Sequence, residues 1–381
     1  MKAEVVRSIA DIPDEAWDAC FPGDPENWAY YRAIEEAGLP AFSWAYFVVR
    51  EAGRIVCVAP AFLTDYRLDT TLQGKVKTLL APVLALFGNA LVLRLLCLGS
   101  PQADRCHIGF APDLGPGQRS SAATQLLAAF AGFAGQERIG LLAAKDVSDA
   151  ALGEGWGEAL AAAGFARQRS LPIATLALPG DEEAYLASLS PGTRREVRRK
   201  LKAAGAVRIE KLAGAQALGC VPQIAALYDG QRQRSGVDYD QFEVLTPAYF
   251  RAVLERLGDR AVVFLYFHET RLVAFNLCLV SPRLFIDKFI GLAQPEARAL
   301  NLYVLSWMQN VRHCVANRIP VLQTGQTGYA MKLRMGSTLA NNWLYFRHRR
   351  RLPDFFLRLA GPLLAADRHD ETLAGSLRGT Q

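Results

Sequence analysis

The sequence predicts a mixed α/β protein, with helices packed on mixed (α+β) sheets, that consists of two similar units in tandem. Its 381 residues are many for one hydrophobic core and sufficient for two domains. Along the chain, β-rich apolar runs alternate with amphipathic helical segments, which is typical of sheets covered by helices. The order of these segments in the first half recurs in the second half, as in an internal repeat.

The first half begins with a predicted strand and two short helices. Ala52-Gly53 separates two β-rich runs, which is a strong signal for a hairpin. A later helix ends at Gly164, since glycine favours the position after a helix C-terminus. We expect a strand at 2–9, helices at 13–21 and 25–37, hairpin strands at 42–51 and 54–63, a helix at 118–136, a strand at 138–144, a helix at 152–163, and one long strand or two short ones at 165–178.

The second half repeats this order. Residues 317–322 match residues 137–142, because each segment ends a helix and enters a strand. The expected elements are hairpin strands at 259–268 and 271–280, a strand at 284–291, a helix at 300–317, a strand at 319–323, a short helix at 329–335 and a last strand at 338–347. We therefore expect one domain over residues 1–179, a second over 180–347 and a tail over 348–381.

The first half is longer than the second between matched positions, and residues 63–98 are the expected insertion. Within it Thr78–Leu93 carries no charge, but Pro82 and Gly88 interrupt the run. It is also shorter than the roughly 18–20 residues of a spanning helix. An insertion outside the repeated core has little to pack against, which favours an interfacial or re-entrant membrane element. A buried helix and strand is the alternative.

The tail has the composition of a membrane-surface helix. Five basic residues at 347–351 precede large apolar residues at helical spacing, namely Phe355, Phe356, Leu359, Leu363 and Leu364. Basic amphipathic segments of this kind lie on anionic membranes. A tail that docks on its own domain is the alternative, and Gly361-Pro362 would bend the helix in either case.

Composition limits the compartment and the kinds of site. The seven cysteines are odd in number and never form a C-x-x-C pair, which argues against a disulfide framework or zinc site and favours a reducing compartment. No apolar signal segment follows the N-terminal Met-Lys. The net charge of +6 mildly favours anionic partners. We expect a cytoplasmic protein, peripheral to the inner face of the membrane.

A strongly basic helix joins the two halves at Ser190–Lys202. Its start is either Ser190 followed by Pro191, or Thr193 with Glu196 in capping-box spacing. Arg194, Arg195 and Arg198 lie on its charged flank. This flank is either a solvated face or a surface that contacts phosphates of a substrate, carrier or lipid.

Several common catalytic motifs are absent from the sequence. It contains no G-x-S-x-G elbow, no Walker A loop and no G-x-G-x-x-G after a strand. Cys106-His107 has no further ligand at metal spacing, so no metal is expected.

Polar residues interrupt apolar strands of the second half instead. Asp287 and Lys288 lie on opposite faces of the predicted strand 284–291, and burial of either charge alone is costly. Each therefore needs an ionic partner or a catalytic task, and Asn276 raises the same question. The polar loop 323–328, with Gln323, Gly325 and Gln326, then precedes a segment that places Tyr329 and Lys332 on one helical face.

Three of these segments together resemble the tandem GNAT-related acyltransferases, which include the Fem-type peptidoglycan aminoacyltransferases and the cellulose-biosynthesis-type GNAT family. They are Leu189–Leu201, the Arg-Leu-Val-Ala hairpin at 271–274, and Tyr329-x-x-Lys332-x-Arg334-x-Gly336. The resemblance covers most of residues 1–347 and implies two GNAT domains that transfer an acyl group to an amine. At 294–299 the chain departs from the family's Q/R-x-x-G-x-G/A pyrophosphate loop. This departure leaves acyl carrier protein or aminoacyl-tRNA open as donors beside acyl-CoA.

The resemblance implies direct attack of a neutral amine on an acyl thioester, with no tightly bound cofactor. Asp287 is the expected base. Lys332 is the expected contact to the oxyanion or to a carrier phosphate, and Tyr329 the expected acid to the leaving thiolate. The expected substrate- and donor-binding residues are Arg194, Arg195, Arg198, Lys288, Asn301, Gln323, Gly325, Gln326 and Arg334.

Three functions are compatible with these features. The first is an N-acyltransferase that resembles the bacterial ceramide synthases and acylates a sphingoid base or other amino-lipid at an anionic membrane. The second is a Fem-type transferase that uses aminoacyl-tRNA on a peptidoglycan precursor, although the chain lacks the helical arm of several such enzymes. The third is a catalytically degenerate GNAT pair that acts as a membrane-bound assembly module.

Overall fold

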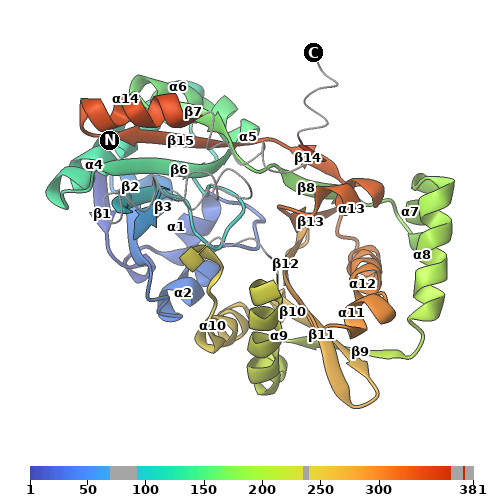
Figure 1. The fold of residues 1–381 in the computed structure, drawn as a ribbon. Helices are drawn as coiled ribbons and strands as arrows, with labels where there is room; N and C mark the ends of the chain where they lie inside the picture. The colour runs from blue at the N-terminus through green and yellow to red at the C-terminus, as the bar shows by residue number, and fades with distance from the viewer. Residues whose placement is uncertain (69–91, 235–239, 362–371, 374–381) are drawn as a thin grey trace.

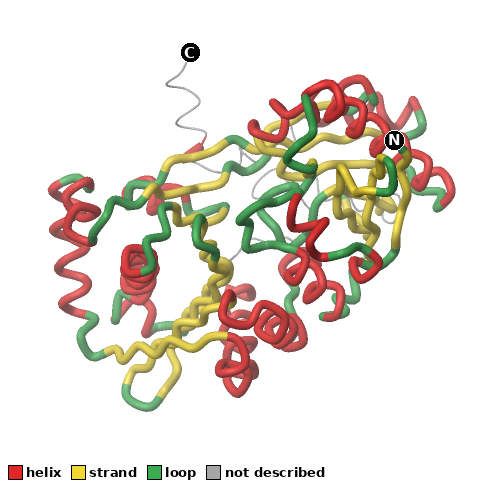
Figure 2. The backbone as a smooth tube through the Cα atoms, turned by 180° about the vertical axis from the view of Figure 1, so that it is seen from behind, coloured by secondary structure: helices red, strands yellow, loops and turns green. Residues whose placement is uncertain are grey.

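The computed structural model describes residues 1–68, 92–234, 240–361 and 372–373 (Figure 1). Its strands form two separate sheets, and helices pack around them (Figure 2). Each sheet mixes antiparallel pairs with one parallel pair in its middle. This arrangement confirms the mixed α/β class and the tandem repeat that the sequence predicts.

The first sheet has eight strands in the described part of the chain. In spatial order they are β1 (Lys2–Val6), β2 (Ser43–Glu51), β3 (Arg54–Arg67), β4 (Val92–Leu98), β6 (Leu141–Ser148), β15 (Asn342–His348) and β7 (Ala166–Arg169), with β5 (Gly109–Phe110) beside β3. Its helices are α1 (Asp14–Ala19), α2 (Trp28–Glu36), α4 (Pro116–Gln136), α5 (Asp149–Ala151) and α6 (Gly157–Ala162).

The second sheet has seven strands in the described residues. In order they are β14 (Thr338–Ala340), β8 (Ile173–Ala177), β13 (Val321–Gly325), β12 (Leu284–Leu292), β11 (Arg271–Val280), β10 (Ala261–His268) and β9 (Val207–Ala213). Its helices are α7 (Glu182–Ser188), α8 (Pro191–Ala203), α9 (Val221–Arg234), α10 (Pro247–Leu257), α11 (Glu296–Ala299), α12 (Leu302–Ala316) and α13 (Tyr329–Arg334), and α14 (Arg351–Ala360) follows β15. Short turns of 3-10 or π-helix occur at Ile9–Asp11, Leu152–Trp156, Gly214–Cys220, Asp240–Glu243 and Gly258–Arg260.

The two halves exchange one strand each. β15 inserts between β6 and β7 of the first sheet, and β8 inserts between β13 and β14 of the second. The predicted run 165–178 thus forms two strands in different sheets, and Pro172 lies between them, where it cannot donate to a ladder. The division into residues 1–179 and 180–347 remains a prediction for the two units. It does not hold for these two strands, each of which lies in the other unit's sheet.

Local backbone chemistry fixes the predicted hairpin and the start of the basic helix. Ala52 and Gly53 both have positive φ, 49° and 82°, as the two central residues of a type I′ turn require. Ser190 caps α8 by accepting from the Thr193 amide, and Pro191 follows at the first helical position. The alternative start, with Thr193 as the cap, is therefore wrong.

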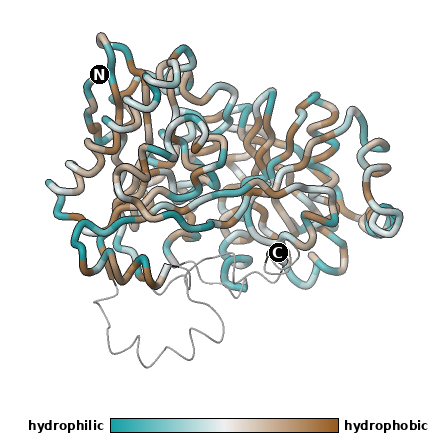
Figure 3. The backbone as a smooth tube through the Cα atoms, turned by 90° about the horizontal axis from the view of Figure 1, so that it is seen from above, coloured by the Kyte–Doolittle hydropathy of each residue, from teal (hydrophilic) through white to brown (hydrophobic). Residues whose placement is uncertain are grey.

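The hydrophobic core is continuous across the junction of the halves. Tyr30 and Ile34 of α2 belong to the same buried cluster as Phe250 and Val253 of α10. The helices α2 and α10 also lie side by side (Figure 1). In Figure 3 the hydrophobic segments run through the interior of both halves. This shared core holds the residues that face the junction in fixed relative positions.

The limits of the predicted insertion need correction. Residues 63–67 end β3, and residues 92–98 form β4, which pairs with both β3 and β6. These residues are therefore core strands and not part of an insertion. Residues 69–91, which include most of Thr78–Leu93, lie outside the described residues. Within the part of the chain that the structure describes, no helix has the length and apolar character needed to cross a bilayer.

The tail helix α14 has one contacting and one exposed apolar face. Leu357 packs against the core shared by the two halves. Leu352, Phe355, Phe356 and Leu359 are 56–68% exposed. Leu363 and Leu364, which the sequence places on the same helix, lie outside the described residues. One side of α14 thus docks on the protein, as the alternative predicts, and the described residues leave its other side uncovered. Contact of that side with a membrane stays a prediction.

Candidate active site

A cavity of about 680 Å³ lies at the junction of the two halves. Both halves supply its polar lining, which includes Gln102, Asp104, Lys145, Asp146, Asp287, Lys288, Gln326 and Lys332. Its apolar lining includes Phe62, Leu95, Leu141, Phe242, Phe289, Leu344, Phe346 and Leu357. A cavity of this size with a few convergent polar groups is typical of a small-molecule or cofactor site.

The cavity meets the second sheet where two parallel strands separate. The pairing of β12 with β13 runs from Leu284↔Val321 to Ile286↔Gln323 and goes no further. Asp287 is the next residue of β12, so its side chain lies at the point where the strands diverge. Asp287 and Lys288 both line the cavity.

A β-bulge lies at these two residues. On β11 Leu277 pairs with Phe289 and the adjacent Cys278 pairs with Asp287, which leaves Lys288 as the extra residue of β12. Asp287 contacts Asn310 of α12, whereas Lys288 contacts Glu26 and Gln102 of the first half. The two side chains thus reach different sides of β12, as the sequence predicts, and both line the cavity where the strands diverge.

Asp287 is held by a short chain of buried amides. Asn310 of α12 donates Nδ2–H to Asp287 Oδ2 at 3.1 Å, and Asn276 of β11 donates to Asn310 Oδ1 at 3.0 Å. Burial raises the pKa of Asp287 to about 6, against the opposing influence of the Lys332 ammonium and of hydrogen bonding by Asn276 and Asn310. A carboxylate with this pKa is ionised at pH 7 and remains basic enough to accept a proton.

Lys332 is the cation opposite this carboxylate. Its ammonium donates to the carbonyl oxygens of Thr324 and Gln326, the latter at 2.8 Å. Burial lowers the pKa of Lys332 to about 8, although Asp287 and Asp104 act in the other direction. Tyr329 does not line the cavity with it, because its buried hydroxyl donates to the Pro172 carbonyl at 2.9 Å. The structure therefore brings together Asp287 and Lys332 but not Tyr329.

Lys288 connects β12 to the first half of the chain. Its ammonium donates to the Glu26 carboxylate and to the Gln102 carbonyl. The side chains of Lys288 and Glu26 are 3% and 1% exposed, so the pair is fully desolvated. Burial alone would lower the pKa of Lys288, but the Glu26 and Asp104 carboxylates raise it above the usual value. Lys288 is thus an interdomain ion-pair partner as well as a cavity-lining residue.

The remaining predicted binding residues divide into two groups. Gly325 and Gln326 line the cavity, and Gln326 Nε2 donates to Asp146 Oδ1 at 3.1 Å. Gln323 is buried within β13, and Asn301 precedes α12 with a left-handed φ of 52°, so that neither lines the cavity. The other four lie outside the cavity lining: Arg194 donates to the Ala187 carbonyl, Arg195 is exposed, Arg198 pairs with Glu183 at 2.6 Å, and Arg334 pairs with Glu196.

The loop between β12 and α12 uses most of its backbone amides in its own hydrogen bonds. It folds into the short helix α11, and the N–H groups of residues 297–301 each donate to a carbonyl within the loop. Pyrophosphate-binding loops need backbone N–H groups that point at the ligand. The departure from the pyrophosphate-loop motif therefore has a structural counterpart.

Sequence reasoning missed the contribution of the first half to this site. Gln102, Asp104, Lys145 and Asp146 all line the cavity. Lys145 and Asp146 form an ion pair at 2.6 Å. Gln102 and Asp104 lie in the loop that directly follows β4. A polar loop at the end of a buried strand is a signal for a site, and the sequence shows it here.

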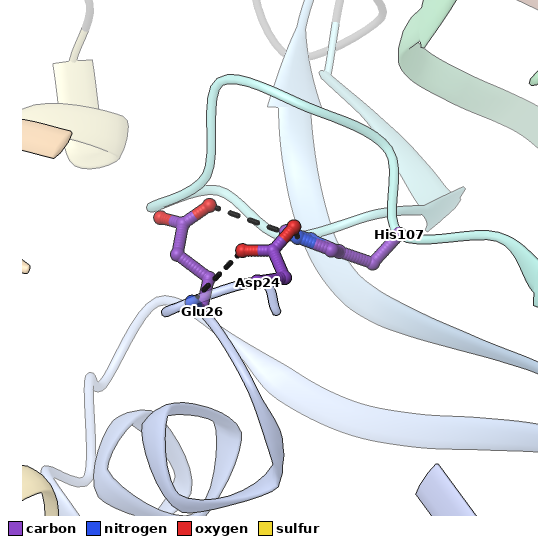
Figure 4. A group of neighbouring side chains, drawn as sticks. All are labelled: Asp24, Glu26 and His107. Carbon is purple, nitrogen blue, oxygen red and sulfur yellow. Dashed lines mark hydrogen bonds and ion pairs between the residues drawn. The ribbon is translucent and has the colours of Figure 1, made fainter. Parts of the chain in front are cut away.

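A second cluster brings together three potential metal ligands. Ligand atoms of Asp24, Glu26 and His107 lie within 4.8 Å of one another (Figure 4). The Arg105 guanidinium contacts Asp24 at 2.7 Å, and Lys288 contacts Glu26. Burial would raise the pKa of Asp24, but Arg105 and His107 hold it well below its usual range. Each carboxylate thus already has a cationic partner, and the cluster works as an ion network that joins the first half to β12.

Comparisons with known proteins agree with this architecture. Residues 192–332 match the model of the acetyltransferase (GNAT) domain. No curated protein matches the chain. The structure of FemX is similar with a TM-score of 0.60 at 12% identity, covering 91% of this chain and 97% of that one.

Two further solved structures have the same fold. The C-terminal domain (DUF2156) of a putative lysylphosphatidylglycerol synthetase from Agrobacterium fabrum has a TM-score of 0.57 at 11% identity, covering 92% and 97% of the two chains. A tandem GNAT protein from the clavulanic acid biosynthesis pathway has a TM-score of 0.52 at 14% identity, covering 91% and 98%. The chain thus has the tandem GNAT fold, and its residues 192–332 match the acetyltransferase (GNAT) domain.

Proposed function

We propose that this GNAT-type acyltransferase transfers a long-chain acyl group from a thioester to the amine of a membrane-associated acceptor, such as a sphingoid base or another amino-lipid. The observation that carries the proposal is Asp287, a carboxylate with a pKa of about 6 at the divergence of β12 and β13, facing a cavity with both polar and apolar lining. An amphiphilic substrate requires both kinds of lining.

The proposed reaction is direct acyl transfer. Asp287 takes a proton from the acceptor ammonium, and the resulting amine attacks the thioester carbonyl carbon. A C–N bond forms, the C–S bond breaks, and the thiolate leaves with a proton as the free thiol. Lys332, on the same cavity, supplies positive charge to the developing oxyanion. The net products are an amide, a thiol and one proton.

The donor is proposed to be acyl-CoA or an acyl carrier protein thioester. The hydrogen-bonded loop at residues 293–301 supports a donor that does not depend on a pyrophosphate cradle there. The Fem-type alternative with aminoacyl-tRNA has the same fold in its favour, because FemX is among the similar structures. The degenerate-module alternative predicts no turnover at all. A mass-spectrometric search for lipid or thioester that co-purifies with the protein is the experiment that distinguishes the three functions.

The tail helix supports a membrane-associated acceptor. Leu357 and Gly361 contribute to the cavity lining, while Phe355 and Phe356 point away from the described core and are 61% and 56% exposed. Arg349, Arg350 and Arg351 lie at the start of the same helix. The combination of exposed aromatics and cations is complementary to an anionic bilayer surface. A lipid in that surface would then lie next to the cavity.

Substitution of both exposed phenylalanines is expected to release the protein from membranes. Phe355→Ser with Phe356→Ser should weaken binding to vesicles that contain phosphatidylglycerol by on the order of 10- to 100-fold, since each buried Phe contributes about 1.5–3 kcal/mol at most. Vesicle co-sedimentation measures the effect. Val244→Ser, at an exposed residue outside α14, is the control. Equal sedimentation of wild type and double variant would contradict a membrane role for α14.

The basic helix α8 is expected to contribute to donor binding through phosphates. Arg195→Ala with Arg198→Ala should raise the donor KM by about 3- to 10-fold and make it less sensitive to salt, because exposed charge contacts contribute only about 0.2–1 kcal/mol each. Steady-state kinetics at two salt concentrations measure both effects, with Arg251→Ala and Arg260→Ala as the matched control. An unchanged donor KM would assign α8 to the solvated surface, and loss of activity on RNase treatment would favour the tRNA donor.

A further inference from the structure

Two side chains of the cavity, Gln102 and Asp104 of the first half, have no hydrogen-bond partner among the described residues. The Gln102 side chain is 5% exposed, and neither its amide oxygen nor its amide nitrogen has a hydrogen-bond partner among the described residues. Gln102 and Asp104 both line the cavity, and Asp104 is half-buried there. No described residue donates a hydrogen bond to the Asp104 carboxylate. A buried amide without partners is costly unless a ligand satisfies it.

The charges around the cavity leave room for one more cation. Lys145 is paired with Asp146, and Lys288 is paired with Glu26. The other charged residues of the lining are Asp104, Glu243 and Asp287 against Arg169 and Lys332, three carboxylates against two cations. The ammonium of Lys332 donates to backbone carbonyls rather than to Asp104 or Asp287. The balance of charge at the cavity is therefore negative, which favours a cationic ligand.

Gly325 keeps the space beside Asp104 open. A Cβ atom at this position would lie 3.0 Å from Asp104 Oδ2, and the backbone has a φ of +71° that disfavours other residues. The residue is at the C-terminal end of β13, next to the divergence from β12. The carboxylate thus faces the same part of the cavity as the catalytic strand.

We propose that Asp104 and Gln102 form the subsite that binds the ammonium group of the acceptor together with an oxygen atom next to it. The Asp104 carboxylate supplies the charge. Gln102 Oε1 accepts from the ammonium and Nε2 donates to the neighbouring oxygen, because the orphaned amide needs both an acceptor and a donor. The substrate class is a primary amine with an adjacent hydroxyl or carbonyl oxygen. This inference rests on the proposed function and names the recognition groups of the same site.

The proposed subsite assigns acceptor binding to the first half and proton transfer to the second. Asp104 and Gln102 of the first half bind and orient the charged acceptor, whereas Asp287 of the second half takes the proton. Substitution of Asp104 should therefore raise the acceptor KM and leave kcat within a fewfold of wild type. Substitution of Asp287 should lower kcat and leave the acceptor KM nearly unchanged.

Direct binding tests the subsite without any donor. The probes are 2-aminooctan-1-ol, octane-1,2-diol, which lacks the ammonium, and octan-1-amine, which lacks the oxygen, titrated by calorimetry into the full-length protein. Wild type should bind 2-aminooctan-1-ol about 10- to 100-fold more tightly than the diol, as expected for a charge-assisted hydrogen bond. Asp104→Asn should abolish that preference, and Gln102→Leu should abolish the preference over octan-1-amine. Asp259→Asn removes the same charge from an exposed position and should bind as wild type.

The outcomes separate this inference from the proposed function. A preference for the amine that Asp104→Asn leaves unchanged, or no preference in wild type, overturns the subsite even when acyl transfer is detected. An Asp104-dependent preference in a protein that forms no amide from any thioester establishes the subsite and overturns the acyl-transfer function. Thermal unfolding of each variant confirms that it is folded, which is expected because Asp104 has no ion pair to lose among the described residues.

Discussion

Asp287→Asn is expected to lower kcat for amide formation by about 10²–10⁴-fold, with little change in the acceptor KM. The amide preserves the shape of the side chain and its contact with Asn310 but cannot take a proton from the acceptor. General-base catalysis contributes roughly this factor in rate. Single-turnover measurement with a saturating thioester isolates the chemical step from product release. Asp259→Asn, on the surface, is the control for loss of one negative charge.

The pH profile gives this prediction a second and independent readout. Asp287 acts only when it is ionised, so kcat/KM of the wild type should fall as the pH drops below about 6. Asp287→Asn should lose that acidic limb. Asn310→Leu removes a hydrogen bond that lowers the pKa of Asp287, so it should move the limb to higher pH. Near-normal turnover in Asp287→Asn with an unchanged limb would remove Asp287 from the mechanism.

The predictable parts of this fold are those determined by local sequence. The hairpin follows from Gly53, which adopts positive φ without steric cost between two β-rich runs, and the end of a helix at Gly164 follows from its φ of 78°. Asp287 stood out because a charge in an apolar strand requires a reason. These features depend on a few neighbouring residues and so are visible in one sequence.

The parts that sequence missed depend on pairing between distant segments. The bulge at Lys288 is a difference of one residue between β11 and β12, and the sequence of β12 alone does not show it. Strand propensity predicts that β8 and β15 are strands, but it does not determine which of the two sheets each strand joins. Asp104 becomes a site residue only because the loop after β4 folds over the cavity against Gly325. Each of these features depends on which distant segment a residue or strand contacts, and not on the local preference of the sequence.

The strongest expected effect on stability comes from the buried pair Lys288–Glu26. Lys288→Met should lower the free energy of unfolding by about 3–5 kcal/mol, because it leaves the Glu26 carboxylate buried without its cation. The Gln102 carbonyl also loses its Lys288 donor, although it still accepts from Tyr30 at 3.0 Å. Urea denaturation of the full chain measures the change. Arg54→Met breaks an ion pair whose side chains are 57% and 58% exposed, and should leave the urea midpoint close to that of the wild type.

A double variant separates the loss of a charge partner from the loss of packing. Lys288→Met with Glu26→Met removes both charges and replaces them with apolar groups, so it should recover most of the stability that either single substitution loses. The same double variant should retain Asp24 with its Arg105 partner, because that pair does not include Lys288. If the double variant is as unstable as the sum of the two single variants, the charges are not coupled. In that case the junction between the halves depends on its other contacts, among them the hydrophobic core of α2 and α10 and the Arg256–Glu36 ion pair.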